Sequence, residues 1–186
     1  METLILVDEQ DNQIGTEEKM QTHFKGLLHR CFSIFIFNSS GKILLQKRAA
    51  QKYHSALLWA NTCCSHPRPN ESDKNAAQRR LKEEMGFSTN LQEIHAFTYK
   101  AKLDHGLTEH EFDHVMAGRF DGEPKPDPKE VDDYRWLSIE ELKAEIKLYP
   151  ERFAVWLKLL MKDRIFLKKA EEFINYLKQT FSPQNL

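Results

Sequence analysis

One helix-forming segment lies between groups of strand-like segments, and this order limits the possible folds more than any other feature. Residues 71–86, ESDKNAAQRRLKEEMG, have polar starting residues, strong helix formers and a glycine at the expected stop. Residues 16–29 lack any such pattern and are predicted to be irregular. Apolar runs next to turns predict strands within 4–15 and 31–48 before the helix, and 94–103, 109–120 and 134–137 after it.

The C-terminal part of the chain is predicted to be helical. Ser138, followed three residues later by Glu141, forms a capping box that starts a helix. The tail predicts a long amphipathic helix or a helix pair, because apolar residues recur at helical spacing at Phe153, Trp156, Leu160, Leu167, Ala170, Ile174 and Leu177. The whole pattern predicts a single α/β (α+β) domain over 1–186, with a mixed sheet packed between helices.

Composition excludes several classes of partner. The chain has 186 residues and a formal net charge of -1, so no bulk attraction to nucleic acid or a membrane is expected. The apolar runs at 4–7 and 31–37 are too short for a signal-peptide core or a membrane span. Three cysteines, an odd number with two adjacent, make a poor disulfide framework and favour a reducing, cytoplasmic compartment.

The stretch NTCCSHPRP, residues 61–69, raises the question of what its thiols do. A zinc finger is disfavoured because no second close Cys pair exists. In an extended segment Cys64 and His66 share one face, whereas Cys63 points the other way. Small core residues are one interpretation of the two cysteines; the other makes Cys64 a thiol that transfers protons or attacks.

The alternation of side chains along a strand also applies to the stretch TEHEFDH, residues 108–114. Glu109 and Glu111 lie on one face of a predicted strand, where solvent-exposed charges are the ordinary alternative. Together with imidazoles from His23, His29 and His66, they could surround one metal ion. Carboxylate oxygens mixed with imidazoles suit Mn²⁺, Mg²⁺ or Zn²⁺.

The segment from Ser65 to Phe87 resembles a Nudix box. That signature runs Gly, five residues, Glu, seven residues, Arg-Glu, apolar, any, Glu-Glu, any, Gly, apolar. Glu71 and Arg79 match it, but Ser65 replaces the first Gly and Arg80 replaces the Glu after the arginine. Loss of the carboxylate removes a metal ligand, which disfavours hydrolysis. The guanidinium in its place favours binding of a diphosphate that is not hydrolysed.

The altered box, with NTCCSHP, EHE and HRCFSIFIFN, resembles the type 1 isopentenyl-diphosphate delta-isomerase family over roughly residues 3–160. The resemblance implies a Nudix-like sheet between helices, followed by a helical extension at about 150–182. It also implies interconversion of isopentenyl and dimethylallyl diphosphate through a tertiary carbocation, by a monomer or weak homodimer.

The resemblance also implies roles for individual residues. The proton-transfer pair is expected to be Cys64 and Glu111. One divalent metal, Mn²⁺, Zn²⁺ or Mg²⁺, is expected on His23, His29, His66, Glu109 and Glu111. A separate Mg²⁺, which accompanies the diphosphate, is expected at Glu84. Substrate-binding groups are expected at Lys19, Arg48, Lys52, Ser65, Arg79, Arg80, Tyr99 and Trp156.

Three alternatives stay open at this point. Trp156 fits a cation-stabilising aromatic face as well as a core position in the last helical stripe. A Nudix pyrophosphohydrolase of a nucleoside diphosphate derivative would release phosphate or a nucleoside monophosphate. A non-catalytic, metal-stabilised interaction module would be unaffected by Cys64→Ala.

Overall fold

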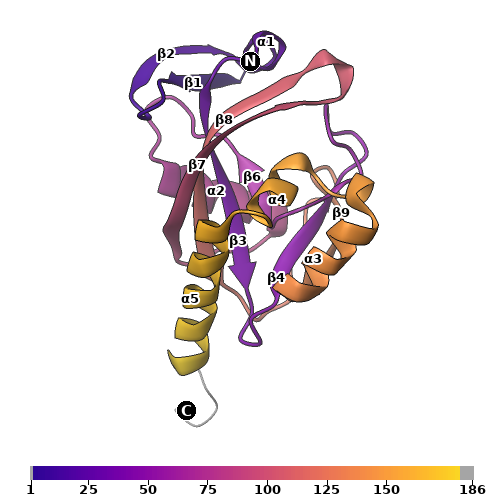
Figure 1. Cartoon of the computed structure of the whole chain (residues 1–186). Helices are drawn as coiled ribbons and strands as arrows, with labels where there is room; N and C mark the ends of the chain where they lie inside the picture. Colours follow the sequence, from indigo (N-terminus) through magenta and orange to yellow (C-terminus); the bar gives the residue numbers. More distant parts are fainter. Residues whose placement is uncertain (1, 181–186) are drawn as a thin grey trace.

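The computed structural model describes residues 2–180, in which nine strands form one sheet with helices on both faces (Figure 1). The strands are β1 Thr3–Val7, β2 Gln13–Glu18, β3 His29–Phe37, β4 Ile43–Arg48, β5 Trp59–Ala60, β6 Cys63–Ser65, β7 Leu91–Lys102, β8 Thr108–Arg119 and β9 Val131–Leu137. The helices are α1 Lys19–Lys25, α2 Asp73–Met85, α3 Ile139–Leu148, α4 Val155–Leu160 and α5 Arg164–Thr180. Short 3₁₀ turns lie at Asp104–Gly106 and Pro150–Arg152.

Strand β3 is the central strand of this sheet. It pairs in parallel with β8 and antiparallel with β1, β4 and β6. Strand β7 pairs antiparallel with β8, and β9 and β5 pair with β4. The predicted mixed sheet is confirmed, including the strands on both sides of the 104–106 turn.

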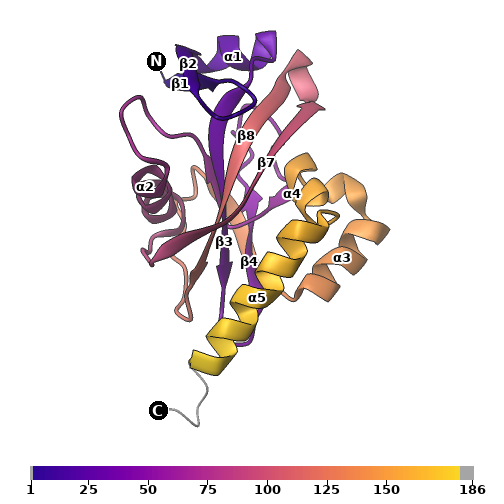
Figure 2. The ribbon, with the colours of Figure 1, turned by 60° about the vertical axis from the view of Figure 1, so that its left-hand side comes forward.

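The core has two layers, because both faces of the sheet are covered. Figure 2 shows α2 on one face and α3, α4 and α5 on the other. Phe32 and Ile34 pack toward α2, whereas Phe35 packs against Phe166 of α5 with ring centroids 4.7 Å apart. Successive side chains of a strand point to opposite faces, so a strand covered on both sides carries apolar residues on both faces, as β3 does from Ile34 to Phe37.

Local signals at both ends explain why α2 forms where it was predicted. The Ser72 hydroxyl accepts a hydrogen bond from the backbone N–H of Asn75 at 3.3 Å. Gly86 ends the helix in the left-handed region, with φ 77°, and its N–H bonds to the carbonyl of Lys82. Such a C-terminal residue is glycine because a Cβ is strained at this φ.

Replacing Gly86 with alanine is expected to destabilise the protein by at least about 1–2 kcal/mol, the usual cost of the left-handed region for an L-residue. The added Cβ would also collide with the carbonyl oxygen of Lys125. Urea unfolding measures the loss. Gly15→Ala is the control, since its Cβ would meet nothing within 4 Å. Equal stabilities of the two variants would contradict this prediction.

The prediction of irregular structure at 16–29 is wrong. Strand β2 ends at Glu18, and α1 follows at once, capped by the Glu18 carboxylate on the N–H of Gln21. The residues that α1 buries are Thr22 and His23, so no apolar periodicity marked it. A helix of seven residues with a polar buried side escapes a search for hydrophobic spacing.

The C-terminal predictions are confirmed. Ser138 and Glu141 form the capping box, with hydrogen bonds of 3.1 and 2.7 Å. The tail is a helix pair, α4 and α5, and α5 packs along the sheet (Figure 2). The predicted extension reached 182, but residues 181 and 182 lie outside the described part of the chain.

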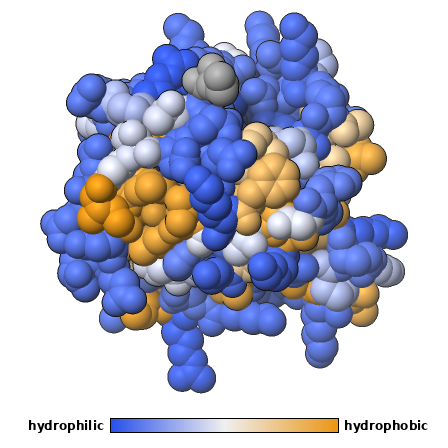
Figure 3. Space-filling view, turned by 90° about the horizontal axis from the view of Figure 1, so that it is seen from above, coloured by the Kyte–Doolittle hydropathy of each residue, from blue (hydrophilic) through white to orange (hydrophobic). Residues whose placement is uncertain are grey.

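No helix within residues 2–180 is long and apolar enough to cross a membrane. Seen from above, on the end that carries α1, the molecule is mainly hydrophilic with separate hydrophobic patches (Figure 3).

Candidate active site

An inner cavity of about 50 Å³ lies at the end of the sheet that carries α1. It opens into a wider outer cavity of about 750 Å³, since Lys19, Lys52, Tyr53, Ser65 and Arg80 line both. The predicted site residues that line the inner cavity are Lys19, Arg48, Lys52, Cys64, Ser65, His66, Arg80, Glu109, Glu111 and Trp156. A narrow chamber behind a wide entrance is suited to a small apolar group with a polar head.

The predicted metal ligands come together from four parts of the chain. His29 on β3 pairs directly with Glu111 on the parallel strand β8. The Nε2 atom of His29 lies 3.5 Å from Glu111 Oε1, and His66 Nε2, just after β6, lies 3.2 Å from the same oxygen. His23 Nε2, from α1, lies 3.2 Å from Glu109 Oε2.

The outer nitrogens of two rings are fixed by the backbone. His23 Nδ1 lies 2.7 Å from the carbonyl of Lys19, and His29 Nδ1 lies 2.9 Å from the carbonyl of Leu27. A carbonyl can only accept, so each Nδ1 carries the proton and each Nε2 turns a lone pair toward the cluster. This arrangement is typical of metal-binding histidines.

The donor set fits a divalent cation. The buried atoms His29 Nε2 and Glu109 Oε2 have no hydrogen-bond partner among the described residues. Burial and the nearby charge of Glu111 raise the pKa of Glu109, so adjacent carboxylates are costly without a cation. A metal would satisfy the unpartnered atoms and neutralise the carboxylates.

Cys64 faces the inner cavity from β6, where it pairs with Ser33 on β3. Its neighbour Cys63 is fully buried in the layer beneath α2, so the two thiols point in opposite directions as predicted. Burial, reinforced by the charge of Asp113, raises the pKa of the Cys64 thiol. The sulfur therefore carries its proton at neutral pH.

Glu111 presents a carboxylate to the same cavity. Burial alone opposes its ionisation, but the nearby imidazoles of His29 and His66 outweigh burial and hold the pKa of Glu111 well below its usual range. Tyr99, directly opposite on β7, donates its hydroxyl to Glu111 Oε2. A protonated sulfur and an ionised oxygen thus line one small chamber.

Asn61 connects the thiol to the aromatic wall, and the sequence analysis missed it. Its Oδ1 accepts from the Cys64 thiol at 2.9 Å and from Trp156 Nε1 at 3.0 Å. Its Nδ2 donates to the carbonyls of Ile34 and Cys63, each at 3.1 Å, which fixes the amide orientation. Asn61 lies within the NTCCSHP stretch, but nothing in the spacing identified its partners.

Asn61→Leu is expected to destabilise the protein by about 1–3 kcal/mol, because buried donors and acceptors are left without partners. Turnover is expected to fall as well, because the Cys64 thiol loses its orientation. Urea unfolding and steady-state kinetics measure both effects. Asn175→Leu on the exposed side of α5 is the control and is expected to change stability by under about 0.5 kcal/mol. An unchanged unfolding free energy for Asn61→Leu would disprove the assignment.

Trp156, at the start of α4, combines the predicted core position with a place on the cavity wall. It is 3% exposed and packs in the core layer beneath α5. It also lines the inner cavity, and the guanidinium of Arg48 lies 5.4 Å from its ring centroid. Arg48 is itself buried and donates to the carbonyls of His54 and Ser55, so it holds the 49–58 loop as well as facing the cavity.

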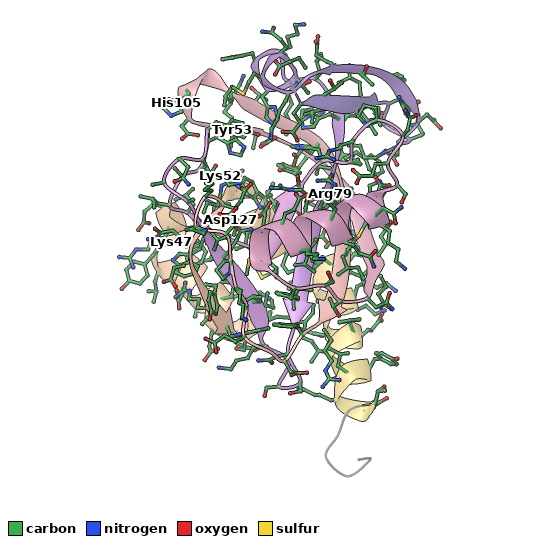
Figure 4. The ribbon with its side chains drawn as sticks, turned by 180° about the vertical axis from the view of Figure 1, so that it is seen from behind. Lys47, Lys52, Tyr53, Arg79, His105 and Asp127 are labelled. Atoms are coloured by element: carbon green, nitrogen blue, oxygen red, sulfur yellow. The ribbon has the colours of Figure 1, made fainter. Side chains whose placement is uncertain are left out.

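Basic side chains surround the outer cavity. Figure 4 shows Lys52 and Tyr53 on one side of this opening and Arg79, from α2, on the other. The basic residues along it are Lys19, Lys52, Arg68, Arg79, Arg80 and Lys129, of which Arg68 and Lys129 were not predicted. A concentration of cations around a wide entrance suits an anionic group such as a diphosphate.

Carboxylates partner these cations in the structure. Lys19 lies 2.9 Å from Glu2, and Lys52 contacts Glu130. The predicted magnesium ligand, Glu84, is 1% exposed and lines neither of these cavities. Its Oε1 accepts from Arg80 Nη2 at 2.6 Å. Glu84 therefore contacts the phosphate-binding candidates through Arg80.

Arg79 differs from its neighbour. It makes a two-point ion pair with Glu71, at 2.8 and 2.7 Å, and reaches only the outer cavity. Tyr99 lies behind Glu111 rather than along the cavity wall. The remaining predicted residues that do not line the inner cavity are His23 and His29, which are fully buried behind it.

Comparison with solved structures identifies the fold. A crystal structure from Deinococcus radiodurans aligns with a TM-score of 0.73 at 20% identity, covering 87% of this chain and 98% of the other. The MutT protein from Methanosarcina mazei aligns with a TM-score of 0.59 at 19% identity, covering 78% and 95%. The NUDIX domain model matches residues 27–158. The Nudix-like fold expected from the box is confirmed.

Comparison with curated proteins is more specific. An isopentenyl-diphosphate delta-isomerase from Serratia proteamaculans (strain 568) is 55% identical over 162 residues, which cover 87% of this chain and 90% of that protein. Isopentenyl-diphosphate delta-isomerase 1 from Aromatoleum aromaticum is 50% identical over 169 residues, covering 91% and 95%. With a NUDIX domain and relatives this similar along most of its length, the chain belongs to the isopentenyl-diphosphate delta-isomerase family.

Proposed function

We propose that this protein is an enzyme that interconverts isopentenyl and dimethylallyl diphosphate, a step of isoprenoid precursor synthesis. The observation that carries the proposal is that a protonated thiol, Cys64, and an ionised carboxylate, Glu111, line one small cavity. The names of the related proteins support the choice of substrate.

The reaction needs one proton added and another removed. Protonation of the terminal CH₂ of the isopentenyl group leaves a tertiary carbocation, and loss of a proton from the carbon nearer the diphosphate gives the dimethylallyl double bond. Cys64 on β6 and Glu111 on β8 provide one group for each transfer, and reversing the reaction exchanges their roles. The substrate gains one proton and loses one, so its atoms and charge are conserved and no external oxidant or reductant is required.

The wall of the inner cavity is proposed to shield the carbocation from water. Water would trap a tertiary carbocation, so the reacting carbons must lie in a small chamber closed by buried groups. The ring face of Trp156 is proposed to stabilise the cation by about 0.5–2 kcal/mol. Its Nε1–H is held by Asn61, which keeps the ring in place at the wall.

A divalent cation is proposed at His23, His29, His66, Glu109 and Glu111. When bound, it supplies positive charge that lowers the proton affinity of a ligating carboxylate. Glu111 is suited to two tasks at once, because Oε1 faces the histidines and Oε2 accepts from Tyr99. Tyr99 is thus proposed to orient the carboxylate that exchanges the proton.

The diphosphate is proposed to bind in the outer cavity. Lys19, Lys52, Ser65 and Arg80 line both cavities and would hold the phosphates at their junction, with Arg79 beyond them. Mg²⁺ accompanying the diphosphate is proposed to bind at Glu84, which already contacts Arg80. Arg80 stands where a Nudix hydrolase has a carboxylate, which disfavours diphosphate hydrolysis.

Incubation with isopentenyl diphosphate and Mg²⁺ in D₂O tests the proposal. The expected product is deuterated dimethylallyl diphosphate without free phosphate, because the added proton comes from exchangeable groups of the enzyme. NMR of the product and a phosphate assay provide the readouts. Phosphate release would favour the pyrophosphohydrolase, and absence of any reaction would favour the interaction module.

The expected partner is this small-molecule substrate, and the protein is proposed to act as a monomer or weak homodimer. A cytoplasmic location is also proposed. It rests on the three free cysteines at Cys31, Cys63 and Cys64, since reduced thiols are typical of a reducing compartment.

A further inference from the structure

A fourth imidazole lies against the proposed metal ligands. His54 belongs to the 49–58 loop between β4 and β5 and is only 4% exposed. Its Nε2 lies 3.2 Å from Glu109 Oε1, whereas Glu109 Oε2 faces His23 at the same distance. The two oxygens of one carboxylate are thus divided between His54 and the metal-binding histidines.

Neighbouring groups fix the His54 ring from several directions. Its Nδ1 lies 3.2 Å from the Ser55 hydroxyl, which can donate a hydrogen bond to it. Its ring stands edge-on to Trp156, with centroids 6.0 Å apart. Arg48 donates to the backbone carbonyls of both His54 and Ser55, which anchors the loop.

The tautomer of the His54 ring follows from the groups that face its two nitrogens. A carboxylate oxygen can only accept a hydrogen bond, so the nitrogen that faces Glu109 is the donor. With Nδ1 accepting from Ser55, the proton resides on Nε2 and points at Glu109 Oε1.

We propose that His54 is a positioning residue of the metal centre: its Nε2–H donates to the outer oxygen of Glu109 and keeps the inner oxygen turned toward His23 and His29. A ligating carboxylate with a free second oxygen can rotate away from the metal, and an outer hydrogen bond prevents that rotation. The inference rests on the metal centre proposed above, to which it adds a residue outside the set of five ligands.

One competing arrangement uses the same atoms. His23, His54 and Glu109 each offer a ligand atom within 4.8 Å of one another, so His54 could bind the ion directly. Direct binding would need a lone pair on Nε2, and the proton would then move to Nδ1. The Ser55 hydroxyl would have to accept rather than donate, so the two arrangements differ in the number of imidazoles on the metal.

Two amide substitutions at His54 test whether a hydrogen-bond donor is needed at the position of Nε2. In His54→Gln the side-chain N–H₂ occupies the Nε2 position, so a donor toward Glu109 is kept. In His54→Asn the amide reaches only the Nδ1 position, and that donor is lost. The control is His95→Asn, which removes another imidazole–carboxylate pair, His95 with Asp163 at 3.1 Å, far from the cavities.

The experiment challenges the Mn²⁺-loaded proteins with increasing chelator and follows bound Mn²⁺ by electron paramagnetic resonance. His54→Asn is expected to weaken Mn²⁺ retention about 10- to 100-fold, as is usual for lost outer-shell hydrogen bonds. His54→Gln is expected to restore most of the affinity, and His95→Asn to match the unsubstituted protein. Electron spin-echo spectra of ¹⁵N-histidine-labelled protein are expected to show three imidazoles on the metal.

Several results would overturn the inference. Four coupled imidazoles would make His54 a direct ligand, and unchanged retention in His54→Asn would leave it without a role at the metal. A His54→Gln variant as weak as His54→Asn would show that the N–H toward Glu109 does not matter. Absence of Mn²⁺ binding by the unsubstituted protein would overturn the metal centre as well, which distinguishes the two failures.

Discussion

Glu111→Gln and Cys64→Ala are each expected to lower kcat by about 10²- to 10⁴-fold, the usual contribution of an acid–base group. Each substitution removes the proton-exchanging group that its side chain offers to the cavity. An amide cannot take up the proton that a carboxylate accepts, and a methyl group has none to give. Steady-state conversion of isopentenyl diphosphate with Mg²⁺ measures the loss.

Matched controls distinguish chemistry from folding. Cys63→Ala alters the adjacent thiol, which faces the layer beneath α2, and is expected to retain turnover at a small cost in stability. Glu93→Gln changes an exposed carboxylate on β7 and is expected to leave turnover unchanged. Circular dichroism should show all four variants folded. Near-normal turnover of either Glu111→Gln or Cys64→Ala would remove that residue from the proposed mechanism.

Stripping divalent cations is expected to lower the free energy of unfolding by about 2.7–4.1 kcal/mol, relative to protein with metal at 100 to 1,000 times its Kd. The proposed ligands come from α1, β3, β8 and the segment after β6, so only the folded chain brings them together. Turnover should be lost with the metal and return when it is restored. Urea unfolding with chelator or with added Mn²⁺ makes the comparison.

Variants of single histidines complete that test. His29→Ala removes a ligand and is expected to make unfolding insensitive to the chelator. His105→Ala changes an exposed residue of the β7–β8 turn and is expected to keep the full dependence on metal. If unfolding of the unsubstituted protein is the same with chelator and with metal, the proposed metal centre is wrong.

Local signals made much of the fold predictable. Helix α2 was predictable because Ser72 caps its start and Gly86 caps its end. The Ser138 capping box marked the start of α3. Helix α1 was not, because it is short and buries Thr22 and His23. Hydrophobic spacing reports only helices that bury an apolar face.

Part of the candidate site was also predictable from local sequence patterns, and part was not. The period of two in a strand was sufficient to place Glu109 and Glu111 on one face and to separate Cys64 from Cys63. No spacing indicated His54, whose contacts with Glu109 and Trp156 join a loop to β8 and α4. Resemblance to a family supplied the five proposed ligands, but not the contact of His54 with Glu109.

The amino-acid sequence by itself determined most of the local elements, the faces of individual strands and the altered box in which Arg80 replaces a carboxylate. Only the tertiary structure decided that β3 and β8 lie in parallel register, which places His29 beside Glu111, and that Asn61 links Cys64 to Trp156. The reason is physical: caps and periodicity act between residues a few positions apart, whereas these contacts exist only after distant segments pack against one sheet.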